Sequence, residues 1–262
     1  MKSKNIAISF VVLTIGITWI LWWGIVIANQ YGFLTYGTPL MLVLYMIGGN
    51  TIPIIAIILL LKLKKMTGKE LIHKIFGFKQ PIRFYIFIIL AAVISYVIPI
   101  VMDTSTITAP LYIALLSLPI MIVGGGLEEV GWRLILQPNL EKKMNFTFAT
   151  LLTGVVWAIW HLPLFFMKGT NQYTWNFFAF AITVIGLSFI LAAIYKISGS
   201  IWLCILFHSI WNALGESITT ESNMLSSLVT TIVVIAVSYI IISLSIRNRT
   251  LEAVAMINHR LK

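Results

Sequence analysis

Apolar residues fill most of the chain in eight long runs separated by short polar segments. Their approximate limits are Ile6–Ala28, Pro39–Leu61, Phe84–Met102, Pro110–Leu140, Phe146–Met167, Trp175–Tyr195, Ile197–Gly215 and Leu225–Ile246. Each run is close to or above the ~20 residues that an α-helix needs to span about 30 Å of hydrocarbon. The pattern therefore predicts an all-α, polytopic membrane protein built as a bundle of about eight transmembrane helices.

The composition supports this prediction. Of 262 residues, 60% are hydrophobic and 10% are charged, whereas soluble domains carry about 25% charged residues. The single cysteine, Cys204, lies inside an apolar run, which excludes a disulfide framework and a CxxC metal site. The sequence shows no internal repeat and no soluble insertion, so we expect one structural domain. Within it we distinguish N-terminal helices with a basic loop (1–109), a core (110–215) and a last helix with a short tail (216–262).

The distribution of lysine and arginine predicts the orientation in the membrane. If the N-terminus is cytosolic, sixteen of the eighteen basic residues fall in cytosolic segments, and the exceptions are Lys168 and Arg133. This asymmetry is the positive-inside pattern and places both termini in the cytosol. It also explains the net charge of +10 without a nucleic-acid partner. The Lys62–Arg83 stretch is expected to lie along the anionic inner leaflet as a short basic helix.

Three charged residues, Glu128, Glu129 and Arg133, interrupt the fourth apolar run. Each would cost about 2.5–3.5 kcal/mol at the centre of a transmembrane helix, so three unpaired charges would cost about 7–10 kcal/mol. On a helix Glu129 and Arg133 share one face because they are four residues apart, whereas Glu128 points about 100° away. We therefore predict that Arg133 neutralises Glu129 and that Glu128 has another role.

Two further runs carry polar side chains, with His161 in the fifth and both His208 and Asn212 in the seventh. Counted at about 1.5 Å per residue from the expected cytosolic ends, Glu128, His161 and His208 lie roughly 18, 22 and 17 Å deep. Pro163 should bend the fifth helix beside His161, since it lacks an N–H and clashes with the preceding turn. The similar depths predict one common site.

Two chemistries fit these residue types. Glu128 could deprotonate a water molecule beside a histidine, while His208 and Asn212 stabilise an oxyanion, so that a peptide bond is hydrolysed without a serine or cysteine nucleophile. Alternatively, Glu128, His161 and His208 could ligate a zinc ion with water in the fourth position. The sequence contains no HExxH motif, no GxSxG motif and no pair of intramembrane aspartates, which excludes the protease designs that need them.

The ordered set of motifs resembles the CPBP family, the CAAX proteases and bacteriocin-processing enzymes also called Abi. The motifs are Glu128-Glu129 with Arg133, an aromatic residue (Trp157) four positions before His161, and His208 four positions before Asn212. The similarity covers about Pro110 to Gly215. The family includes type II CAAX prenyl endopeptidases and lysostaphin-resistance protein A. One position departs from its pattern, because Trp157 stands where the family usually has phenylalanine.

The resemblance implies an intramembrane endopeptidase, with or without zinc, in a bacterial plasma membrane, acting on a membrane-associated peptide or protein. Glu128 would match the catalytic glutamate, with Glu129 and Arg133 as its supporting pair. His161 would help to activate water. His208 and Asn212 would stabilise the oxyanion, or His208 would bind the metal.

Two other classes of protein fit the same residues. A transporter or proton-relay protein also carries buried charges, although the two-fold hydropathy repeat typical of many transporters is missing. A non-catalytic protein, such as an immunity protein that binds a peptide in the same cavity, is the second alternative.

The predicted orientation can be checked by cysteine labelling in intact cells. Cysteines placed at Asn171 and Asn223, which fall in outer loops, should react with a membrane-impermeant reagent, whereas a cysteine at Lys65 should not. Labelling at Lys65 alone would show that the orientation is inverted.

Overall fold

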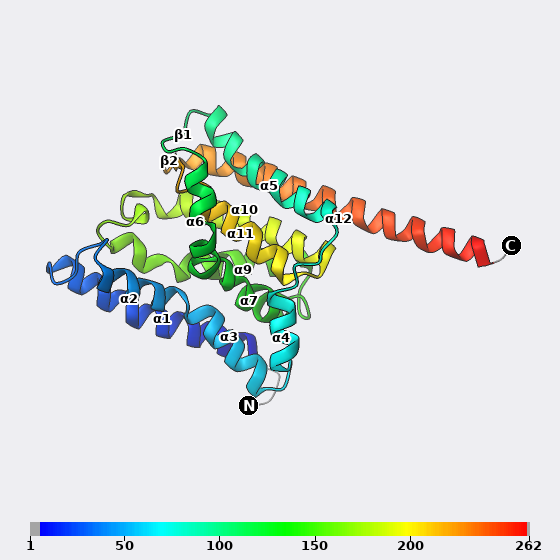
Figure 1. Ribbon diagram of the computed structural model, residues 1–262, viewed down its shortest axis with the longest axis horizontal. Helices are drawn as coiled ribbons and strands as arrows, with labels where there is room; N and C mark the ends of the chain where they lie inside the picture. The colour runs from blue at the N-terminus through cyan, green and yellow to red at the C-terminus, as the bar shows by residue number, and fades with distance from the viewer. Residues whose placement is uncertain (1–5, 261–262) are drawn as a thin grey trace.

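The computed structural model describes the backbone of residues 6–260 and the side chains of residues 6–247. It is a bundle of long helices (Figure 1). These are α1 (Ile6–Gln30), α2 (Pro39–Gly49), α3 (Thr51–Lys62), α5 (Ile82–Val101), α6 (Tyr112–Gly124), α9 (Phe146–Trp160), α10 (Phe177–Ser198), α11 (Ile201–Leu214) and α12 (Met224–Arg260). The shorter elements are α4 (Gly68–Ile75), α7 (Glu129–Gly131), α8 (Gln137–Leu140), β1 (Ser105–Ile107) and β2 (Ile218–Thr220).

Seven helical segments in the described part of the chain are long and apolar enough to cross a membrane, with α2 and α3 counted together. The protein is therefore an all-α polytopic membrane protein, as predicted. The seventh predicted segment, Ile197–Gly215, is not among these seven and forms the shorter helix α11 of 14 residues, about 21 Å long. Part of the predicted length is lost because Gly199, with φ +67°, ends α10 in a left-handed turn.

Helix α11 nevertheless returns the chain to the opposite end of the bundle. The start of α10 is held near the start of α12, since the Asn176 N–H donates to the Ser222 hydroxyl at 2.7 Å. At the same end β1 pairs antiparallel with β2, from Ser105 opposite Thr220 to Ile107 opposite Ile218. The β pair and α4 lie at opposite ends of the molecule (Figure 1), so α11 crosses the interior between them.

Small residues permit the closest helix contacts around α10, which packs between α9 and α12. A Cβ on Gly154 would lie 3.0 Å from the Ile185 Cα, and a Cβ on Gly186 would lie 2.8 Å from the Thr231 hydroxyl oxygen. In lipid the hydrophobic effect contributes little to helix association, so the van der Waals contacts made at such close approach hold the helices together. Helix α12 also lies along α5 and continues past it toward the C-terminus (Figure 1).

The fourth predicted helix is broken beside its charged residues. Helix α6 accommodates Pro119 and ends at Gly124, and Gly125 is extended, with φ −171°. A 3₁₀ turn over Gly126–Glu128 leads into α7, and a π-helical turn over Trp132–Leu136 leads into α8. π-Helical turns are frequent at functional sites, and this one carries Arg133.

Two other local predictions are confirmed. Helix α9 ends at Trp160, and a 3₁₀ turn containing Pro163 follows, so the predicted bend lies beside His161. In the basic stretch, α4 is a short helix that begins with a capping box between Thr67 and Glu70. Hydrogen bonds from the Thr67 backbone N–H and hydroxyl hold the pKa of Glu70 below its ordinary value.

The packing of α7 against the N-terminal helices yields a test of the fold. A Cβ on Gly131 would lie 2.5 Å from the Phe10 ring and 2.6 Å from the Ile52 side chain. Gly131→Ala should therefore overpack the core and lower the free energy of unfolding by about 1–3 kcal/mol, measured by denaturation in detergent. The matched control is Gly16→Ala, because a Cβ there meets nothing within 4 Å. An equal effect of both substitutions would contradict the tight α7 contact.

Candidate active site

Glu129 lies at the centre of the charged cluster. One of its oxygens, Oε2, accepts from Arg133 Nε at 2.8 Å, so the predicted pair is present. The other, Oε1, lies 3.0 Å from His208 Nδ1. The side chains of Glu129 and Arg133 are fully buried, and that of His208 is 5% exposed. A single carboxylate therefore joins the broken fourth segment to α11 across 79 positions of sequence.

The buried guanidinium of Arg133 is satisfied by further polar groups. It donates to the amide oxygen of Gln137, and its two terminal nitrogens lie 3.5 Å from the Ser188 hydroxyl. The amide nitrogen of Gln137 in turn donates to Thr150 at 3.0 Å. A buried charge is tolerated only when it is paired and its remaining donors are bonded, and this network, which draws on α8, α9 and α10, fulfils both conditions.

Glu128 occupies a different environment, although it is the neighbour of Glu129 in the sequence. Its Oε2 accepts from two indole N–H groups, Trp157 Nε1 at 2.8 Å and Trp132 Nε1 at 3.4 Å. Among the described side chains none bonds its second oxygen, Oε1. The carboxylate is 7% exposed and has no arginine partner there. The structure thus separates the two glutamates as the helical spacing predicts: one is in an ion pair, and the other is held only by neutral donors.

The polar face of α11 lies against Gly125. A Cβ added to Gly125 would come 3.3 Å from His208 Nε2 and 2.2 Å from Asn212 Nδ2. The neighbouring Gly126 is equally close, since its Cβ would lie 2.3 Å from the Ser209 hydroxyl. The two glycines thus let α11 approach closely. They also place His208 Nε2 and the Asn212 amide beside an extended backbone that immediately precedes Glu128.

His161 lies at the C-terminal end of α9 and is not part of the ion pair. Its Nδ1 is 2.8 Å from the Trp157 carbonyl oxygen, and its ring packs against Trp160 and Phe180 at centroid distances of 4.6 and 5.1 Å. The Trp157 ring contacts both His161 and His208, at 6.1 and 5.1 Å. His161 therefore adjoins the site through Trp157 and has no direct hydrogen bond to Glu128 or His208 in the described part of the chain.

Sequence reasoning missed the two indole donors to Glu128. The motifs identify Trp157 only as an aromatic position and assign no role to Trp132. Trp132 could have been found, because it is four residues after Glu128 and hence on the same helix face. Trp157 could not, because its N–H reaches Glu128 through the packing of α9, 29 positions along the chain.

The three predicted metal ligands do not fit a zinc site as they are arranged. Within the described residues, no group of three or more His, Cys, Asp or Glu side chains is placed to hold a metal ion. One oxygen of Glu128 accepts from two tryptophans, and the Trp157 ring contacts both His161 and His208.

The fold and this cluster define a polytopic membrane protein with a buried glutamate–arginine–histidine centre. Residues 109–214 match the family described as type II CAAX prenyl endopeptidase Rce1-like. A protein of Methanococcus maripaludis named CAAX prenyl protease 2 is 26% identical over 117 residues, which cover 41% of this chain and 43% of that relative. Residues 109–214 are therefore similar to the Rce1-like family, in agreement with the resemblance that the motifs indicated. The match spans less than half of the relative's length.

The ion pair predicts a difference between single and double substitutions. Arg133→Leu should destabilise the fold by about 3–5 kcal/mol, because it leaves the Glu129 charge buried without its main partner. Glu129→Gln combined with Arg133→Leu should cost less, because no unpaired charge remains. Thermal unfolding in detergent measures both. If the double variant were as unstable as the single one or more so, the pair would not be the source of the effect.

Proposed function

We propose that the protein is an intramembrane endopeptidase that hydrolyses a peptide bond of a membrane-associated peptide or protein. The observation that carries the proposal is the contrast between the two glutamates. Glu129 is committed to Arg133 and His208, whereas Glu128 is a buried carboxylate held on one oxygen by two tryptophans. The similarity of residues 109–214 to the Rce1-like family supports the same class of reaction.

Glu128 is the proposed general base. The two indole N–H groups fix its orientation through Oε2, so that Oε1 can accept a proton from a water molecule. The water then attacks the carbonyl carbon of the scissile bond, and Glu128 returns the proton to the leaving amine. A positioned base of this kind contributes about 10²–10⁴-fold to a rate. His161, whose Nδ1 is bound to the Trp157 carbonyl, is proposed to orient the water through its other nitrogen.

His208 and Asn212 are the proposed donors to the oxyanion. The carboxylate of Glu129 faces His208 Nδ1, and it would stabilise the positive charge that His208 carries when Nε2 is also protonated. That Nε2 and the Asn212 amide lie together around Gly125, within reach of one developing oxygen. Arg133 keeps Glu129 ionised and in place, and therefore acts through Glu129 and not on the substrate.

The proposed substrate class rests on the comparisons and not on the site. The Rce1-like similarity and the name of the archaeal relative favour a peptide ending in a CAAX sequence, with or without a prenyl group. We further propose that the protein acts in a bacterial plasma membrane, as the family resemblance implies, with both termini in the cytosol, as its lysine and arginine distribution predicts. A non-catalytic peptide-binding protein would have the same fold, and the Glu128 test below distinguishes it.

Glu128→Gln should abolish detectable cleavage of a farnesylated peptide with a CAAX end, in protein reconstituted in lipid vesicles. The amide keeps an oxygen that can accept from the two indoles, so the fold and peptide binding should be retained while the base is lost. Asn212→Ala should reduce the rate by about 10²–10³-fold. The matched control is Glu141→Gln, the same change farther along this segment, where the carboxylate is partly exposed. Full activity of Glu128→Gln would refute the proposed mechanism.

A metal-dependent mechanism predicts a different result. In the mechanism proposed here a zinc chelator leaves the cleavage rate of the wild type unchanged, and His208→Ala does not alter metal content. If the chelator silences the enzyme and His208→Ala protein loses bound zinc, as measured by elemental analysis, Glu128, His161 and His208 must approach one another more closely than they do here.

A further inference from the structure

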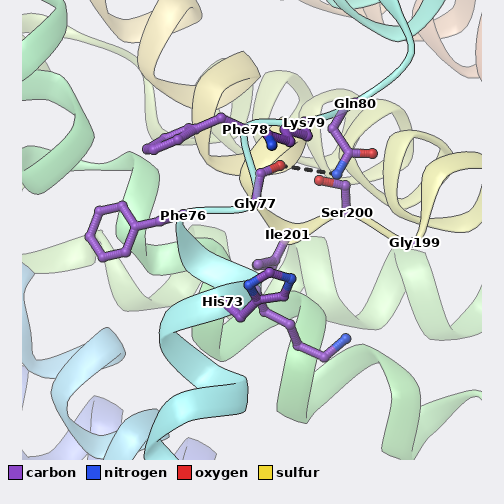
Figure 2. Close-up of a pocket in the computed structure, with 10 residues that line it drawn as sticks. His73, Phe76, Gly77, Phe78, Lys79, Gln80, Gly199, Ser200 and Ile201 are labelled. Carbon is purple, nitrogen blue, oxygen red and sulfur yellow. Dashed lines mark hydrogen bonds between the residues drawn. The ribbon is translucent and has the colours of Figure 1, made fainter.

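A cavity of about 460 Å³ opens at the end of the bundle where α4 lies. It is formed by the linker between α4 and α5 and by the turn between α10 and α11 (Figure 2). The lining residues are His73, Lys74, Phe76, Gly77, Phe78, Lys79, Gln80, Gly199, Ser200 and Ile201. The proposed protease chemistry uses none of them.

The polar part of this cavity is suited to an anion. Lys74 and Lys79 line it, and no aspartate or glutamate is among its lining residues. Helix α11 begins in its wall at Ile201, and the Ser200 hydroxyl caps the N–H of Leu203. The first N–H groups of an α-helix have no partner within the helix and form the positive end of its dipole, which is a common binding site for phosphate.

Apolar side chains adjoin the same cavity. Phe76 and Phe78 are 56% and 52% exposed, and Figure 2 shows their rings extending to one side while Gln80 and Ser200 lie at the other. The linker leads directly into α5, and Ile82 at its start is 72% exposed. Exposed phenylalanines beside lysines at the end of a spanning helix fit the boundary between headgroups and acyl chains.

We propose that this cavity binds the phosphate headgroup of an anionic phospholipid. Lys74, Lys79 and the N-terminus of α11 contact the phosphodiester, and Phe76 and Phe78 contact the upper part of the acyl chains. The apolar rings distinguish a lipid from free phosphate, because free phosphate offers them nothing to bury. The proposal does not depend on the proposed protease activity.

The bound lipid would strengthen the contact between the linker and α11. Phe78 packs edge-on against Trp202, with ring centroids 4.5 Å apart. The Trp202 indole donates to the Tyr85 hydroxyl at 3.2 Å, and that hydroxyl donates to the Phe78 carbonyl at 2.5 Å. The cavity thus lies where the linker is fastened to α11, two helical turns before His208.

The test compares lipid retention by the full chain purified in detergent. Native mass spectrometry should show phosphatidylglycerol bound in preference to phosphatidylcholine, and Lys74→Ala with Lys79→Ala should lower the affinity for phosphatidylglycerol roughly tenfold or more. The matched control is Lys142→Ala with Lys143→Ala, which removes two lysines from the α8–α9 turn outside the cavity, and it should retain the lipid. Gln80→Lys adds a positive charge to the lining and should raise the affinity, which keeps the test decisive if the double variant does not fold.

Three outcomes would overturn the proposal. Equal losses in the two double-lysine variants would show that the lipid is held by diffuse surface charge. Equal retention of phosphatidylcholine would show that the cavity does not recognise an anionic headgroup. Displacement of the lipid by millimolar inorganic phosphate, with no preference for the lipid, would show that the cavity takes free phosphate.

Discussion

The structure depends on the Glu129 carboxylate, which accepts from both Arg133 and His208. Its burial with Arg133 would carry a large desolvation cost if either group lacked its partner. A carboxylate and a guanidinium without solvent are stable only when each has its partner and its remaining hydrogen bonds. The broken fourth segment cannot shift along its axis or rotate without losing the bond from Glu129 to His208, and α11 cannot withdraw without losing the same bond. The positions of the fourth segment and of α11 are therefore coupled through one side chain.

The break in the fourth segment follows from the same constraint. In a continuous α-helix the backbone N–H and C=O groups around Glu128 would bond only within the helix. A side chain at position 125 would also prevent α11 from approaching. Instead, Gly125 and Gly126 let α11 approach until His208 Nε2 and the Asn212 amide lie around the backbone. The 3₁₀ turn then directs Glu128 toward Trp157 while the following turn directs Glu129 toward Arg133. Two adjacent carboxylates thereby receive opposite environments, which is a recurrent way to divide roles between acids in one site.

The two ends of the molecule differ in chemistry. One end has the short β pair and the hydroxyl-rich contacts between Asn176 and Ser222. The other has the basic helix α4, the lysine-lined cavity and the first turn of α11. Since α11 runs between these ends and carries His208 and Asn212 at its far turns, a lipid bound at the basic end and a peptide bound at the charged centre would contact the same helix.

The sequence by itself determined the class of fold and the local pairing. The all-α membrane-spanning bundle, the Glu129–Arg133 pair and the bend at Pro163 follow from apolar length, from i,i+4 spacing and from the missing N–H of proline, which act over a few residues. Other features depended on tertiary packing. The shortness of α11, the indole donors to Glu128 and the place of His161 behind Trp157 arise where helices far apart in sequence meet. Residues on one helix face are fixed by its periodicity, but the neighbour that each face meets is decided only when the whole bundle has packed.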